Sequence, residues 1–117
     1  MGLLLVLVGL GCVRPVPVVA SPAPVMDAAG AQARQFALRS EVALAEGDSA
    51  EAARWATWLV RVDGSAPAAL HAADVLRRAG AFDRAEEAAV AAITAGGGAE
   101  AHRMLGWVRL ERGDPAG

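Results

Sequence analysis

The stretch LAEGDSAEA at residues 44–52 returns twice in altered form further along the chain. The later copies read RRAGAFDRA at 77–85 and LERGDPAG at 110–117, so Gly47, Gly80 and Gly113 are spaced 33 residues apart. Each glycine follows a stretch rich in alanine and leucine, and the first two also precede one. Because glycine readily adopts the left-handed conformation that ends many helices, each copy predicts a tight turn between two antiparallel helices. The sequence therefore predicts an all-α fold built from repeated helical hairpins.

Capping residues and helix-breaking residues set the bounds of the predicted helices. Asp48 and Ser65 have the side chains of helix N-caps, and Pro67 falls in a first turn, where its missing amide hydrogen costs nothing. The glycines at 96–98 interrupt the helical pattern. We therefore expect helices over 28–46, from the Asp48 cap to Val62, from the Ser65 cap to Gly80, over 83–94 and over 99–112.

Small residues recur at the same distances after the first two glycines, at Ala52 and Ala56 and again at Ala85 and Ala89. Two helices that cross closely need small side chains at the crossing, so these alanines are predicted to be buried there. The second helix also carries Trp55 and Trp58, and we expect Trp55 to be the one that packs into the core.

The period and the residues resemble tetratricopeptide repeats, whose unit is a helix–turn–helix of about 34 residues. In the third unit, Leu105-Gly106 and Gly113-Asp114 stand where that family has its Leu-Gly pair and its closing turn. The resemblance implies a short solenoid of about two and a half repeats over residues 27–117, with the last repeat truncated. An unrelated small α-helical bundle is the alternative.

In the tetratricopeptide family, the first helix of each unit lines a concave groove that binds a peptide or protein. The resemblance implies that Arg77, Arg78, Arg103 and Trp107 lie on this wall. Arginine pairs with carboxylates through paired hydrogen bonds, and an indole ring covers apolar side chains, so an acidic or C-terminal peptide is the expected partner. The alternative is that Arg77 and Arg78 are solvated charges at a helix C-terminus, with Trp107 covering the end of the stack.

The first residues have the features of a targeting segment. Residues 2–13 are almost continuously apolar, but a bilayer-spanning helix needs about 20 such residues. Gly11 precedes Cys12, so residues 1–12 resemble a bacterial lipoprotein signal, and the resemblance implies lipidation of Cys12. The proline-rich residues 13–26 would then form an extended tether. Alternatively, a secretory peptidase cuts after Ala20, or the apolar segment is an uncleaved anchor or follows a misassigned start.

Charge and motif content weigh against other classes of function. The net charge is −2 with the two signs interspersed, which is not the basic field that nucleic-acid binding requires. His71 and His102 stand apart from any cysteine or carboxylate at metal-ligand spacing, and the adjacent Glu86 and Glu87 have the pattern of a solvated helix face. We therefore expect no catalytic residue, no metal and no cofactor.

Together these features predict a non-catalytic protein-interaction module, tethered by lipid to a membrane of the bacterial cell envelope, at the outer membrane or the periplasmic face. Two alternatives stay open. The hairpins could serve as a structural or accessory subunit of an envelope assembly without a peptide groove. The chain could also be a secreted or periplasmic helical protein without a lipid anchor.

Overall fold

The computed structural model describes the backbone of residues 22–113 and the side chains of residues 29–113. The described residues form α2 (Pro22–Ala45), α3 (Ser49–Val62), α4 (Ala66–Arg78), α5 (Phe82–Thr94) and α6 (Gly98–Arg112), with no strand among them. The predicted signal segment with Cys12, and most of the predicted tether, lie outside this range. None of the described helices is long and apolar enough to cross a bilayer.

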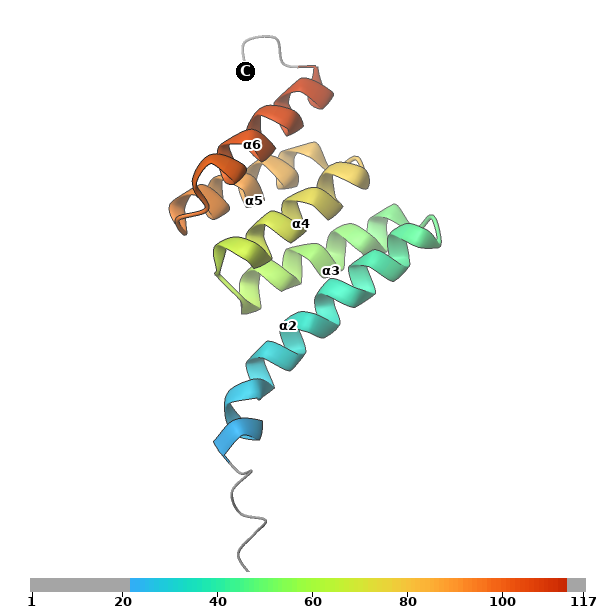
Figure 1. The fold of residues 1–117 in the computed structure, drawn as a ribbon. Helices are drawn as coiled ribbons and strands as arrows, with labels where there is room; N and C mark the ends of the chain where they lie inside the picture. Colours follow the sequence, from blue (N-terminus) through green and yellow to red (C-terminus); the bar gives the residue numbers. More distant parts are fainter. Residues whose placement is uncertain (1–21, 114–117) are drawn as a thin grey trace, which may run out of the picture.

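Successive helices run antiparallel and pack against each other, as α2–α3, α3–α4, α4–α5 and α5–α6. α4 also contacts both α2 and α6, so these three helices form one layer of the stack, with α3 and α5 behind them (Figure 1). The structure confirms the predicted all-α stack of helical hairpins. α2 is the longest of the described helices, and its N-terminal part extends beyond the rest of the stack (Figure 1).

The turns after α2, α4 and α6 have the conformation that the repeated glycines predict. Gly47, Gly80 and Gly113 have φ of +80°, +81° and +85°, in the left-handed region. At the first turn the amide of Asp48 donates to the carbonyl of Ala43 over 2.8 Å, a bond that satisfies a carbonyl at the helix end. The amide of Ala81 makes the equivalent bond to Leu76 over 2.9 Å. The recurring glycine is therefore a helix-ending residue at each repeat.

The predicted N-caps of α3 and α4 are also confirmed. Asp48 accepts a hydrogen bond from the amide of Glu51 over 3.1 Å, and Ser65 accepts one from the amide of Ala68 over 3.3 Å. The start of α2 differs from the prediction, because the helix begins at Pro22 and not after Asp27. Proline is tolerated in a first helical turn, where its missing N–H has no partner to lose, so the tether predicted over 13–26 ends earlier.

The core consists mainly of alanine. Ala52, Ala56, Ala85 and Ala89 are each 0% exposed, which confirms the predicted close crossings. The largest fully buried side chains are those of Leu76, Val75, Val108 and Ser40. Trp55 is half-buried and stacks on Phe36 with ring centroids 5.3 Å apart, whereas Trp58 remains 44% exposed.

Ser40 in α2, Ala73 in α4 and Gly106 in α6 stand 33 residues apart, one in each predicted repeat. Ser40 and Ala73 are 0% exposed, and the Ser40 hydroxyl donates to the carbonyl of Ala37 over 2.7 Å. Gly106 is exposed, because α6 has no following helix in the described part of the chain. A small residue at this position allows the next helix to approach closely.

Replacing Gly106 by alanine is expected to raise the free energy of unfolding by about 0.5–1 kcal/mol, since glycine costs that much inside a helix. A Cβ at Gly106 would meet nothing within 4 Å. Gly97 offers the matched contrast, because a Cβ there would lie 2.9 Å from both the Ala101 Cβ and the Ala92 carbonyl oxygen. Urea unfolding should show opposite signs for Gly106→Ala and Gly97→Ala; stabilisation by both would contradict the packing at α5–α6.

Candidate functional site

Arg77 and Trp107, two residues of the predicted groove, are in direct contact between α4 and α6. The Arg77 guanidinium carbon lies 4.0 Å from the centroid of the Trp107 ring, within the range of a cation–π interaction. The same guanidinium pairs with Asp74 at 2.8 Å and with Glu111 at 3.0 Å. Burial of Arg77 opposes its charged form, but the hydrogen bonds to Asp74 and Glu111 outweigh this and raise its pKa. Its side chain is only 12% exposed, so Arg77 is not the solvated helix-end charge of the alternative reading.

Arg78 carries the same network from α4 to α2. Its guanidinium donates to Glu41 over 2.7 Å and lies 2.9 Å from an oxygen of Asp74. The hydrogen bond to Glu41 is the main cause of the raised pKa of Arg78. His71 also lies 3.4 Å from Glu41. Ion pairs between side chains of this chain therefore connect α4 to α2 and to α6.

Arg103 does not join this network. It is exposed on α6, one helical turn before Trp107, and makes no ion pair in the described part of the chain. Trp107 keeps 47% of its surface exposed. A partner's carboxylate could reach Arg103 directly, but at Arg77 and Arg78 it would have to displace Asp74, Glu41 or Glu111. The use of these arginines for peptide binding stays a prediction. At Arg77 and Arg78, the chain's own carboxylates would compete with those of a bound peptide.

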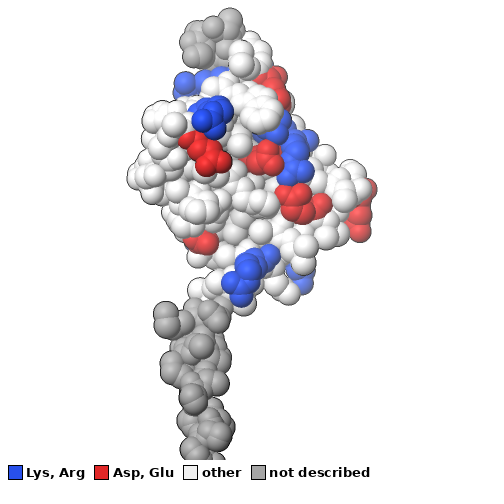
Figure 2. Space-filling view, in the orientation of Figure 1, with Lys and Arg blue, Asp and Glu red and all other residues white. Residues whose placement is uncertain are grey.

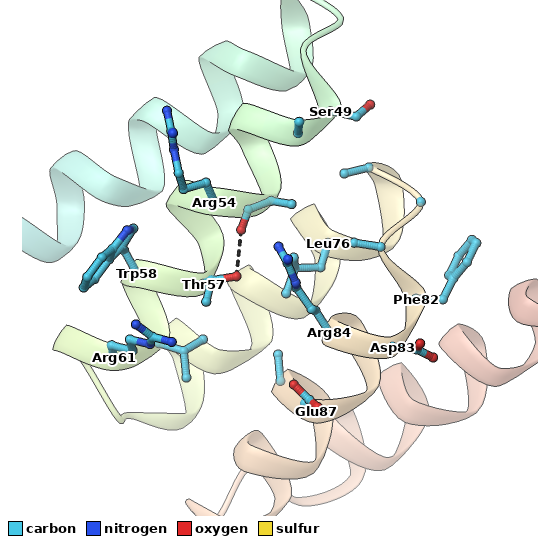
Figure 3. A pocket seen from close by; sticks show the side chains of 17 residues that line it. Ser49, Arg54, Thr57, Trp58, Arg61, Leu76, Phe82, Asp83, Arg84 and Glu87 are labelled. Carbon is cyan, nitrogen blue, oxygen red and sulfur yellow. Dashed lines mark hydrogen bonds between the residues drawn. The ribbon is translucent and has the colours of Figure 1, made fainter.

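The opposite layer contains a hollow that the sequence did not single out, which we call the α3–α5 groove (Figure 3). It has a volume of about 1160 Å³ and lies between α3 and α5, over the C-terminal end of α4. Buried Ala53, Ala88 and Leu76 form part of its apolar lining, and Trp58 and Phe82 also belong to the lining residues. Both helices carry alanine on the side that faces the groove. Because alanine side chains are small, they do not fill the space between the helices.

Charged side chains of both signs line the α3–α5 groove, and they differ in how they are neutralised. Arg54 forms an ion pair with Glu51 on the same helix, and Asp83 is held by Arg112 at 3.0 Å. The guanidinium of Arg61 lies 5.1 Å from the centroid of the Trp58 ring and has no carboxylate partner among residues 29–113. Sequence reasoning missed Arg54, Arg61 and Arg84 as site residues, since only their common position around a hollow distinguishes them from other surface arginines.

Arg84 and Glu87, on α5, complete the charged lining of the groove. Neither makes an ion pair within the described range. Figure 3 shows Arg84 extending from α5 across the groove towards α3. Among the described residues that line the groove, two guanidinium groups and one carboxylate therefore form no ion pair, which leaves an excess of one positive charge.

On the face of the molecule seen in Figure 2, the two signs of charge are mixed. Figure 2 shows basic and acidic side chains close together on the face in view, with uncharged surface between them. Side chains of α5 and α6 pair in the same way, with Arg109 Nη2 3.0 Å from Glu86. Within residues 29–113, no group of three or more histidine, cysteine, aspartate or glutamate residues has the geometry of a metal site. Comparison of the chain with protein families, curated proteins and solved structures finds no match.

Proposed function

We propose that this chain is a non-catalytic protein-interaction module, held at a membrane of the bacterial cell envelope by a lipid on Cys12. The observation that carries the interaction role is the α3–α5 groove, an open hollow with an apolar lining and two guanidinium groups that pair with no carboxylate of residues 29–113. Recognition sites combine apolar surface with a few polar groups that fix the orientation of the bound molecule. The membrane tether rests on the lipoprotein-like sequence before Cys12.

We also propose that the stack belongs among the tetratricopeptide-like repeats. Its support is the 33-residue spacing of three helix-ending glycines, together with left-handed φ values between +80° and +85° at each of them. Buried Ser40 and Ala73 at the position of the family's glycine add to this support, because the family keeps a small residue there. Repeats of this kind serve as binding surfaces for proteins and peptides.

A second candidate function is a structural subunit of an envelope assembly. The observation in its favour is the apolar surface at the two ends of the stack. On α2, Leu38 and Val42 are 63% and 45% exposed, and on α6 Leu110 is 75% exposed. Exposed apolar patches of this kind often mark contacts with other proteins. In this function the stack would be permanently extended by neighbouring subunits at its ends.

A photo-crosslinking amino acid placed at single positions of the full-length chain in its native host distinguishes the two functions. Replacement of Trp58 samples the α3–α5 groove, Leu38 and Leu110 sample the ends, and Arg34 is an exposed control on α2. An interaction module should give a discrete protein adduct at Trp58 and none at Arg34. Adducts restricted to Leu38 and Leu110 would favour the structural subunit, and absence of adducts at all four positions would contradict both functions.

The proposed lipid anchor on Cys12 can be tested in the same cells. Mass spectrometry should find a mature N-terminus at Cys12 that carries acyl chains, and a fatty-acid label should be incorporated into the chain but not into the Cys12→Ser variant. One acyl chain holds a protein only weakly, whereas several hold it firmly, since each buried methylene contributes about 0.8 kcal/mol. An unmodified N-terminus at Ser21 would instead indicate the secreted alternative.

A further inference from the structure

The α3–α5 groove is larger than a typical small-molecule site. Its volume of about 1160 Å³ exceeds the usual range of about 300–1,000 Å³, and it is open to solvent along the two helices. Its lining also includes the exposed Trp58 and the half-buried Phe82. A segment of polypeptide with one apolar side chain fits this shape better than a compact ligand does.

The charges of the groove decide the chemistry of that segment. On the opposite face, Arg77 and Arg78 are already neutralised by Asp74, Glu41 and Glu111. Arg61 and Arg84 have no such partner in the described range, and Glu87 offsets only one of them. The groove therefore attracts carboxylates, while the chain's net charge of −2 opposes the approach of an extended polyanion such as a nucleic acid.

A contact with Trp58 accompanies the free charge of Arg61. The guanidinium carbon lies over the Trp58 ring at 5.1 Å from the centroid, within the range of a cation–π interaction. A guanidinium has five N–H donors, and no carboxylate of the described residues pairs with those of Arg61.

We propose that the α3–α5 groove binds a short acidic segment of a partner protein. Carboxylates of the segment pair with Arg61 and Arg84, and an apolar side chain lies against the accessible apolar surface of Trp58 and Val60. This proposal rests on the proposed interaction function and adds to it the surface and the charge of the partner.

Selection from a random-peptide phage library against the full chain in nanodiscs of zwitterionic lipid tests the proposal. Enriched peptides should be rich in aspartate and glutamate and contain an aliphatic or aromatic residue. Enrichment of basic or uncharged peptides, or no enrichment, would overturn it. The crosslinking at Trp58 in cells does not depend on this outcome, so the acidic segment can fail while the interaction function stands.

Affinities of the most enriched peptide, measured by fluorescence anisotropy, then locate the site. Arg61→Gln and Arg84→Gln should each weaken binding about 5-fold, as loss of roughly 1 kcal/mol of ion pairing predicts. Arg34→Gln on α2 removes the same charge from an exposed position outside the groove and should leave the affinity unchanged. Glu87→Gln should tighten binding, because it removes the competing carboxylate. Equal loss with Arg34→Gln, or unchanged affinity with both groove variants, would overturn the proposal, provided circular dichroism shows that each variant is folded.

Discussion

Replacing Leu76 by alanine is expected to lower the free energy of unfolding by about 2–5 kcal/mol, the range for deleting a fully buried leucine side chain. Leu76 lies near the C-terminal end of α4 and is only 2% exposed. Most of the residues in the core cluster around it are alanines, whose side chains have no rotatable bonds that could fill the cavity. The cost should therefore lie towards the upper part of the range.

Small domains have a total stability of only about 5–15 kcal/mol, so Leu76→Ala should leave a large fraction of the chain unfolded. Equilibrium urea unfolding followed by circular dichroism measures the loss. Leu110→Ala is the matched control, because Leu110 is 75% exposed on α6 and its truncation should change stability by less than about 0.5 kcal/mol. Similar losses in the two variants would mean that the core is not organised around Leu76.

Replacing Ala89 by leucine is expected to destabilise the stack by about 1–3 kcal/mol or more, through overpacking. Ala89 is 0% exposed on α5, which packs closely against α4. The additional carbon atoms can be accommodated only if the two helices move apart. That movement would also disturb the lining of the α3–α5 groove, to which α5 contributes.

Ala99→Leu provides the matched control, since Ala99 is exposed in the first turn of α6. The same increase in volume there should leave the urea midpoint nearly unchanged, as surface substitutions usually do. A neutral effect of Ala89→Leu would show that the α4–α5 crossing tolerates a larger residue, against the argument that small residues determine the spacing of the helices.

The sequence alone determined the architecture, because the signals for it are local. A glycine in the left-handed region ends a helix wherever it occurs, and Gly47, Gly80 and Gly113 do so as predicted. The Asp48 and Ser65 caps bond to amides only three residues away. The predicted start of α2 was wrong, because the residues there are compatible with two states. Proline fits both an extended tether and a first helical turn, and at Pro22 the helix prevailed.

Only the tertiary structure decided which arginines are available to a partner. Arg78 and Arg77 reach Glu41 and Glu111, which are 37 and 34 residues away in sequence, because neighbouring hairpins bring α2, α4 and α6 side by side. Arg61 and Arg84 lack such partners for the same reason, since no carboxylate of the described chain is brought within ion-pairing distance of them. Ion pairing depends on distances across helices, and local sequence does not encode these distances. The groove arises likewise from the spacing between α3 and α5, which is set by their common contacts with α4.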